Sequence, residues 1–329
     1  MDLTLGPEQE SVRDAIRGML ADRLPIARIR AHPEIDDAVW REAGDLGWFT
    51  LGLPESAGGA GYGHPEEMIL FVELGRALAP GPWLGTVLAA HALGAEAGAR
   101  RVAVVDDPTD RLLRDARLAG TADAVAHAAG VDGLLVVGGT QVRWVAADAR
   151  GLAVAARPSI DPTRPLARVR FDGVAAEDVP VDAAALRARA TVLVAAEAVG
   201  VAERTLEASV AYAKVRQQFG RPIGSFQAVK HRCADMAVRA EVARSITTWA
   251  AVAVRDDEPD AARTVREAKA LAGDAALANA SDNVQNHGGM GFTWEADAHL
   301  YLKRAWLLEH QFGSRAAQLD ALAAGWTAE

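Results

Sequence analysis

Apolar residues recur at helical spacing in the first hundred residues of the chain. Pro7 suits the first position of a helix, and the residues behind it place an apolar stripe on one face, made of Val12, Ile16, Met19 and Leu20. Further helices are predicted over about 36–46, over about 65–78 and from Pro82 onward. Residues 47–63 hold six glycines and one proline, so we expect an irregular loop there.

The pattern changes between residues 101 and 180. Short runs rich in β-branched residues are separated by Gly, Asp or Pro, which is typical of strands. These runs are VAVV at 102–105, GLLVVGG at 133–139, VRWVAA at 142–147, GLAVAA at 151–156 and ARVRFDG at 167–173. They predict a small antiparallel sheet or barrel, after which residues 174–181 return the chain to helix.

Helical periodicity then fills the rest of the chain. Long helices are predicted over about 183–217 and 225–253, a third ends near residue 286, and a fourth covers about 295–322. Four long helices with short connections indicate a bundle. The predicted fold is therefore mainly α with a small β domain. Its parts are an N-terminal helical domain (1–100), the β domain (101–181) and a C-terminal four-helix bundle (182–329).

Composition narrows the classes of function. Half of the residues are hydrophobic, which excludes a disordered chain, and the net charge of −9 argues against a nucleic-acid-binding surface. The sequence has neither a secretory leader pattern nor a long apolar run, so we expect a cytoplasmic protein with no membrane span. The single cysteine, Cys233, shares a helical stripe with Met236 and Ala240, which predicts a small core side chain rather than a nucleophile. We predict no metal site.

The first candidate site is the segment RQQFGRPIG at 216–224, between two predicted helices. A positive charge at a helix end, such as Arg216, is able to bind an anion, and an aromatic side chain beside it, such as Phe219, is able to stack on a base. An arginine at a helix end is also commonly a solvated charge, and the residues alone leave both interpretations open.

The second candidate site is QNHGGMGF at 285–292. Two adjacent glycines, Gly288 and Gly289, let a backbone approach a phosphate or a ribose closely because they carry no Cβ atom. A helix end followed by a turn explains the same glycines equally well. We expect His287 to serve local packing rather than to act as an acid, since no carboxyl group is fixed beside it by spacing.

Taken together, the two segments resemble the C-terminal half of acyl-CoA dehydrogenases, flavoenzymes that desaturate acyl thioesters between Cα and Cβ. The first match continues without a gap through Gly220, Ile223, Phe226 and Gln227. The predicted order of domains is also that of the family, so the resemblance extends over nearly the whole chain. It is strongest in 1–90 and 195–310 and weakest in 101–180.

The resemblance implies a role at the FAD held mainly by a neighbouring subunit. By this match Arg216 would pair with the pyrophosphate, Gln218 would hydrogen-bond near it, and Phe219 would pack against the extended part of the cofactor. Gln285, Gly288 and Gly289 match residues that contact the same FAD.

The catalytic base of the family is missing from both of its usual places. The reaction needs a carboxylate to remove the α-proton while the flavin takes the β-hydride. One matching position is Phe312, followed by Gly313, and the other is Ala190. Glu309 would serve as a base only with a shift of register. Glu197 lies on an apolar helical stripe, where a buried, hydrogen-bonded structural role is expected instead.

A second departure lies in the β domain. The stretches that hold and seal the flavin ring in the family have no counterpart in 101–150, where Trp144 and Thr140 lie in predicted strands of a different context, and the domain looks shortened. The chain thus resembles the short, base-lacking subunit of heteromeric acyl-CoA dehydrogenases that act on steroid side-chain CoA esters in actinobacteria. TWEADAHLYLKRA at 293–305 is similar to such subunits, although an amphipathic bundle helix explains it as well.

The resemblance implies the partners as well as the cofactor. They are a homologous dehydrogenase subunit, preferably in an α2β2 assembly, an acyl-CoA substrate and an electron-transfer flavoprotein. Two alternatives stay open at this stage. One is a self-sufficient homomeric enzyme with a displaced base such as Glu309, and the other is a flavin-free scaffold or acyl-binding protein.

Overall fold

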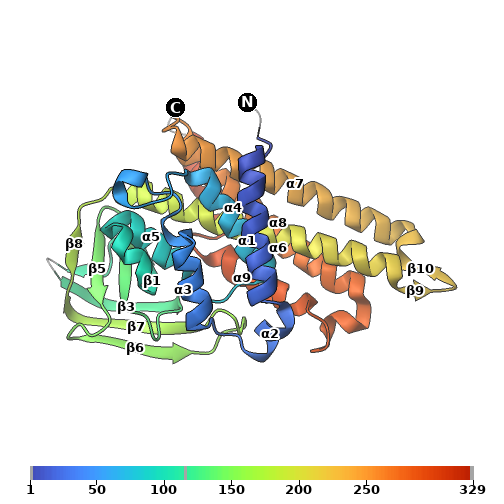
Figure 1. The fold of residues 1–329 in the computed structure, drawn as a ribbon, viewed down its shortest axis with the longest axis horizontal. Helices are drawn as coiled ribbons and strands as arrows, with labels where there is room; N and C mark the ends of the chain where they lie inside the picture. Colours follow the sequence, from blue (N-terminus) through green and yellow to red (C-terminus); the bar gives the residue numbers. More distant parts are fainter. Residues whose placement is uncertain (1–2, 115–116, 327–329) are drawn as a thin grey trace. The chain divides into compact units, whose positions relative to one another are not determined.

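The computed structural model describes residues 3–114 and 117–326. Within them the chain forms two compact units, which we call the helical unit and the sheet unit (Figure 1). The helical unit consists of the chain up to Ala27, Met68–Ala79 and the chain from Thr191 on, and the sheet unit of Arg28–Glu67 and Pro80–Ala190. The mainly helical fold with a small sheet region is confirmed. The domain boundaries after residues 100 and 181 stay a prediction.

Long helices make up the helical unit. They are α1 (Pro7–Arg23), α4 (His64–Ala77), α6 (Ala183–Val215), α7 (Gln227–Arg255), α8 (Ala261–His287), α9 (Ala298–His310) and α10 (Arg315–Trp326), of which α4 and α6 begin in the sheet unit. A short hairpin, β9 (Gln217–Gln218) and β10 (Arg221–Pro222), and the turn η4 (Ile223–Ser225) join α6 to α7 (Figure 1).

One predicted helix is wrong. Residues 295–322 form two helices, because Phe312 and Gly313 have φ angles of 55° and 95° that no α-helix accepts. The buried Lys269 of α8 holds the turn, since its Nζ donates to the carbonyl oxygens of Glu309 and Gly313 at 2.9 Å each. Burial lowers the pKa of Lys269 to about 8.

Two glycines let α4 and α6 approach each other backbone to backbone. A Cβ atom on Gly75 would lie less than 3.0 Å from the carbonyl oxygen of Glu197, and one on Gly200 would lie equally close to that of Val72. The contact is reciprocal, so neither position accepts a side chain without separating the helices.

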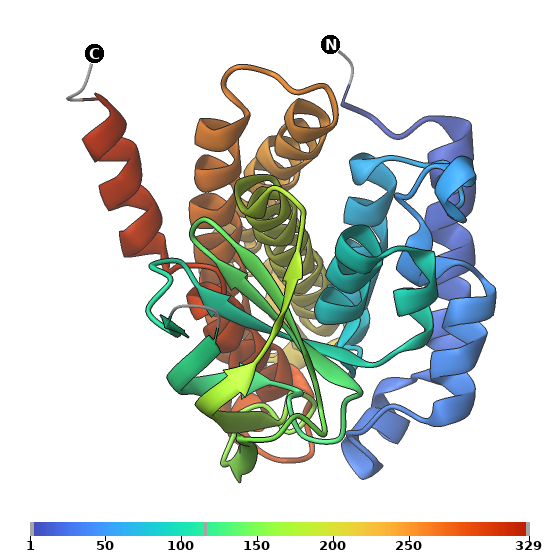
Figure 2. The ribbon, with the colours of Figure 1, turned by 90° about the vertical axis from the view of Figure 1, so that its left-hand side faces the viewer.

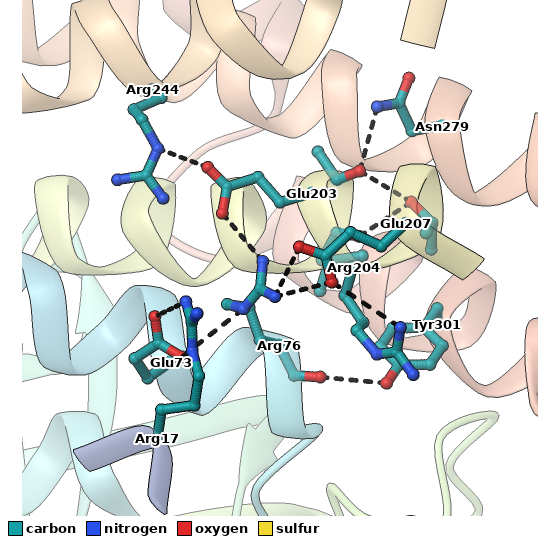
Figure 3. Close-up of polar contacts among 12 residues, drawn as sticks. Arg17, Glu73, Arg76, Glu203, Arg204, Glu207, Arg244, Asn279 and Tyr301 are labelled. Atoms are coloured by element: carbon teal, nitrogen blue, oxygen red, sulfur yellow. Dashed lines mark hydrogen bonds and ion pairs between the residues drawn. The ribbon is translucent and has the colours of Figure 1, made fainter. Parts of the chain in front are cut away.

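Charged side chains surround this contact (Figure 3). The guanidinium group of Arg76 lies 3.5 Å from Glu73, 3.1 Å from Glu203 and 2.7 Å from Glu207. Arg17 of α1 pairs with Glu73 at 2.8 Å, and the Tyr301 hydroxyl of α9 donates to the Arg76 carbonyl oxygen at 3.0 Å. Arg76 therefore links α4 to α6 and α9, and its neighbour Glu73 links α4 to α1.

Two four-stranded sheets form the core of the sheet unit (Figure 2). Their orders are β1-β4-β5-β8 and β2-β3-β7-β6. The strands are β1 (Val102–Asp107), β2 (Leu113–Arg114), β3 (Arg117–Ala126), β4 (Gly133–Gly138), β5 (Val142–Ala146), β6 (Leu152–Arg157), β7 (Leu166–Ala175) and β8 (Glu177–Val179). Both sheets contribute to one apolar core, which includes Val105 of β1, Leu134 of β4 and Phe171 of β7.

The five predicted strand segments are confirmed, with three corrections. The sheets are not purely antiparallel, because β1 pairs with β4 in parallel. The sequence pattern missed β3, whose residues 117–126 contain few β-branched side chains and whose pairing with β7 is interrupted by two irregularities. Thr140 lies in the bend between β4 and β5 rather than in a strand, and its backbone N–H donates to Asp110.

Helices and short turns complete the sheet unit. They are α2 (Ile26–Ala31), which begins in the helical unit, α3 (Asp37–Asp45), η1 (Trp48–Thr50), η2 (Glu55–Ala57), α5 (Trp83–Leu93) and η3 (Ala95–Ala99). The glycine-rich segment 47–63 contains η1 and η2 joined by turns, as its composition predicts. In the described part of the chain, no helix combines the length and apolar character needed to span a bilayer.

A buried ion cluster sits at the start of α4 in the sheet unit. The carboxylate of Glu67 pairs with Arg189 of α6, and its oxygens lie 3.2 Å from His64 Nδ1 and 2.5 Å from His91 Nε2. Burial by itself raises the pKa of Glu67, but the two histidines and the Arg189 charge lower it far more, to well below its usual range. Burial lowers the pKa of His64.

Glu67→Gln should lower the free energy of unfolding by about 3–5 kcal/mol, because it leaves the mostly buried charge of Arg189 without its counter-charge. Urea denaturation of the lone chain measures this. Asp123→Asn, which breaks the exposed pair with Arg168, is the control and should change little. Equal effects of the two substitutions would contradict the central role of Glu67.

Acidification should destabilise the folded chain in two steps. Below the ordinary His64 pKa of 6.5, the unfolded chain binds a proton that the folded chain resists, so stability falls. Below the ordinary Glu67 pKa of 4.5, stability falls further as the pH approaches the lowered folded pKa. Denaturation midpoints across this pH range test the expectation, and Glu67→Gln should flatten the lower step.

Candidate functional site

The segment after α6 is a tight and fully exposed hairpin. Phe219 and Gly220 have φ angles of 52° and 75°, so both central residues of the turn are left-handed, as in the primed turns of β-hairpins. The backbone N–H of Arg216 still donates to the Tyr212 carbonyl of the last helical turn at 2.9 Å. The Arg216 carbonyl in turn accepts the N–H of Ile223 at 2.8 Å, which closes the hairpin.

The side chains that the sequence singled out in this hairpin face solvent. Arg216 and Gln218 are exposed, and the ring of Phe219 is 90% exposed. A phenylalanine in a left-handed conformation is strained, and an exposed ring gains nothing from burial. The ring meets Phe226 edge to face with centroids 6.0 Å apart, and most of its surface still faces solvent, so the hairpin carries two energetic costs.

The loop after α8 is built on glycine. Gly288 has φ 60° and ψ −139°, a conformation that is essentially restricted to glycine. Gly291 folds back on α8, where a Cβ atom would collide with the carbonyl of Val284. Gly289 needs neither explanation, because its φ is not positive and the described chain leaves open space around the position of a Cβ atom.

The two segments lie at one end of the helical unit. Asn279 Nδ2 of α8 donates to the Ala202 carbonyl of α6, and Ser209 Oγ donates to Asn283 Oδ1 further along both helices. The helices are therefore parallel, and both finish where the exposed segments begin. The sequence-predicted residues Gln285, Gly288 and Gly289 are exposed there as well. His287 packs locally, as predicted, by stacking on Tyr212 with ring centroids 4.2 Å apart.

Exposed aromatic and apolar side chains extend this end of the unit. They are Val215 and Phe219 beside the hairpin and Met290, Phe292 and Trp294 in and after the glycine loop η5 (Gly288–Phe292). The amphipathic-helix alternative for 293–305 expected Trp294 to face inward, which is wrong, because Trp294 precedes α9 and is exposed. The sequence alone assigned no role to Phe292. Phe292 and Trp294 are 83% and 70% exposed, which the sequence pattern does not indicate.

The two positions that the sequence resemblance matches to the catalytic base of the family hold no acid. Phe312 is buried in the turn between α9 and α10, and Ala190 is fully buried in α6. Of the two alternative acids, Glu309 is engaged locally, because its carboxylate accepts the N–H of Arg315 at 2.8 Å and lies 2.9 Å from His310 Nδ1.

Glu197 is the other alternative acid, and it is buried. Its carboxylate accepts a hydrogen bond from Arg304 of α9 at 2.6 Å, and Arg304 itself is fully buried. The predicted structural role of Glu197 matches this ion pair.

The other buried carboxyl groups are also engaged. Asp107 accepts backbone N–H groups of Arg111 and Leu112, and Asp161 accepts both the N–H and the hydroxyl of Thr163. Asp106 of β1, which the sequence did not single out, has a pKa raised by burial in spite of its pairing with Arg187. Among the described residues, no cluster of three or more His, Cys, Asp or Glu side chains fits a metal ion.

The chain belongs to the acyl-CoA dehydrogenase family. Residues 6–101 match the model of the acyl-CoA dehydrogenase N-terminal domain, and residues 185–326 match that of the C-terminal domain. Members of this family are oxidoreductases that bind FAD. The two matched ranges leave residues 102–184 between them, which is the region where the resemblance is weakest.

Related proteins include steroid-type dehydrogenases. Acyl-CoA dehydrogenase IpdE2 of Mycobacterium tuberculosis is 37% identical over 92% of both chains. FadE34 of the same organism is 36% identical over 93% of this chain but only 46% of its own length. Among solved structures, a chain of the Tcur3481-Tcur3483 steroid ACAD is 29% identical, with a TM-score of 0.87 over 99% of this chain and 100% of its own.

The ChsE4-ChsE5 complex of Mycobacterium tuberculosis contains a second similar chain. It is 27% identical, with a TM-score of 0.88 over the full length of both chains. The resemblance to heteromeric dehydrogenases of the steroid type is therefore confirmed.

Phe219→Asn should raise the free energy of unfolding of the lone chain by about 1 kcal/mol, because asparagine tolerates the left-handed conformation that φ 52° imposes. Phe219→Leu is the matched control and should give no gain, since leucine keeps the strain. Chemical denaturation measures both variants. A loss of stability in Phe219→Asn would mean that the contact of the ring with Phe226 contributes more than the backbone strain costs.

Proposed function

We propose that this protein is a subunit of a flavin-dependent acyl-CoA dehydrogenase and completes the FAD site of a homologous partner subunit that carries the catalytic base. The observation that carries the proposal is that the chain exposes the candidate cofactor-binding residues but has no acid at the positions matched to the base. Arg216, Phe219 and Gly289 are presented to solvent at one end of the helical unit. The positions for a base hold Phe312 and Ala190.

The residues present fit a dinucleotide that approaches from outside the chain. Gly289 has no internal reason to be glycine, and the open space at its Cβ position suits close approach of a ribose or phosphate to the backbone. Arg216 is exposed and offers a positive charge for a pyrophosphate, and most of the Phe219 ring is exposed. Arg216 also stands at the C-terminal end of α6, where a positive charge is favourable.

Bound FAD would supply the acceptor for the hydride that leaves Cβ of the acyl thioester. Removal of the α-proton needs a carboxylate, and three candidate acids of this chain are poorly suited to it. Glu197 is held by Arg304, Glu67 has a lowered pKa, and Glu309 holds a backbone N–H. The partner would therefore supply the base.

The relatives support a partner of the same family. The ChsE4-ChsE5 complex and the Tcur3481-Tcur3483 enzyme each join two different chains, and each contains a chain similar to this one. FadE34 matches this chain with 46% of its length, so its polypeptide has room for a second part of similar size. We infer an α2β2 assembly, a steroid side-chain acyl-CoA as substrate and an electron-transfer flavoprotein as acceptor.

Two other functions compete with this one. A self-sufficient homomeric enzyme would use Glu309 as its base and would hold FAD without a partner. A flavin-free scaffold or acyl-binding protein would hold none in any assembly. Flavin content separates the three.

FAD per chain should be near zero in the purified protein alone and about one per pair of unlike chains after co-expression with a base-bearing homologous subunit. Absorbance of the released flavin measures the ratio. Full flavin on the lone chain would favour the homomeric enzyme, and its absence from a stable complex would favour the scaffold.

Arg216→Ala should weaken FAD binding by the complex by about 10-fold or more, since a charge-assisted hydrogen bond contributes roughly 1.5–3 kcal/mol. Arg255→Ala removes an arginine from the other end of α7, where it pairs with Asp256, and serves as the control. Fluorescence titration of FAD measures both variants. Equal retention of FAD in the two variants would count against the role of Arg216.

Glu309→Gln should leave turnover of the complex nearly unchanged, because Glu309 acts locally in the turn between α9 and α10. The steady-state rate with an acyl-CoA substrate measures this. A collapse of activity with intact flavin content would identify Glu309 as a displaced base.

A further inference from the structure

A ladder of polar contacts joins α6 to α8 and leads to both exposed segments. Its first rung is the hydrogen bond from Asn279 Nδ2 to the Ala202 carbonyl at 3.1 Å. Its second rung is the bond from Ser209 Oγ to Asn283 Oδ1 at 2.9 Å. Because all these groups are buried, each bond fixes the relative register of the two helices strongly.

The last rung is the stack of Tyr212 on His287. The ring planes are inclined by 24°, and the centroids lie 4.2 Å apart. His287 Nδ1 lies 2.8 Å from the carbonyl oxygen of Asn283, so this nitrogen donates and the ring orientation is fixed to the second rung. The stack therefore continues the ladder by one helical turn on each side.

Both partners of the stack adjoin the candidate site through the backbone. The Tyr212 carbonyl accepts the N–H of Arg216, the first residue of the hairpin segment. His287 immediately precedes Gly288, where the chain leaves α8 with a glycine-specific conformation. A change in the distance between the two rings would shift the two segments relative to each other.

A pocket lies beside the glycine loop and next to the ring stack that joins the two segments. It has a volume of about 290 Å³ and is lined by both rings, Met290, Ile26 and Tyr301, among others. The pocket, which is partly open to solvent, therefore leaves space beside Met290 of the loop. The ring stack forms part of the cavity wall and bridges α6 to the base of the loop.

We propose that Tyr212 and His287 are positioning residues that set the spacing between Arg216 and the Gly288–Gly289 backbone, so that both reach one dinucleotide. The proposal rests on the proposed function for the identity of the ligand. The two buried hydrogen bonds already join α6 to α8. The ring stack is therefore needed for the position of the two exposed segments rather than for the fold, and it requires an aromatic ring on each helix.

Tyr212→Leu should weaken FAD binding by the complex by roughly 2- to 10-fold, the range expected for the loss of one aromatic pair. Tyr212→Phe keeps the ring and should bind FAD as the unchanged protein does. Trp306→Leu removes a second aromatic–histidine pair, that with His310 on α9, and is the matched control without effect on FAD. His287→Leu combined with Tyr212→Leu should weaken binding little more than either alone, because the residues act as a pair.

Hydrogen exchange on the lone chain tests the same link without a partner. In Tyr212→Leu, backbone amides of residues 216–223 and of 288–293 should both exchange faster, while those beside the second rung keep their protection. Faster exchange in only one segment, or FAD binding by Tyr212→Leu equal to that of Tyr212→Phe, would overturn the proposal. If the unchanged complex holds no FAD, the proposed function fails, and the exchange pattern still decides whether the rings couple the segments.

Discussion

The close approach of α4 and α6 is the constraint on which the helical unit depends. Gly75 and Gly200 bring the two backbones together, and the carbonyl of Glu197 lies in that contact. The side chain of Glu197 is thereby placed beside Arg304 of α9. Because α6 is one continuous helix, the same contact also fixes the height at which Ser209, Tyr212 and finally Arg216 occur. The packing of α4 against α6 thus determines the position of residues several turns away.

Charge pairing explains why this fold tolerates so many buried acids. Arg76 pairs with three carboxylates, and Arg304 pairs with Glu197. Arg189 pairs with Glu67, which two histidines also contact. For Glu67 the pairing outweighs burial and holds its pKa well below its usual range, away from the range in which a general base works. The contacts that give Glu67 its structural role make it a poor proton acceptor.

Sequence patterns predicted the long helices well, because their apolar stripes repeat over many turns. The strand β3 escaped because two pairing irregularities and small residues hide its alternation. The break between α9 and α10 was not predicted, because phenylalanine rarely adopts the positive φ that Phe312 has. The candidate residues of both segments were found through motif resemblance. Their exposure and the Tyr212–His287 stack required coordinates, since the stacked residues lie 75 positions apart in the sequence.

The exposed ring of Phe219 affects the stability of the chain when no other protein covers it. Its left-handed backbone and its water-exposed surface are costs that any protein surface covering the ring would offset together. By mass action, a chain with such an end is more stable where that surface is abundant. Under the proposed function, the folded lifetime of this protein would depend on the ratio in which it and its partner subunit are synthesised, because excess copies would keep the ring exposed.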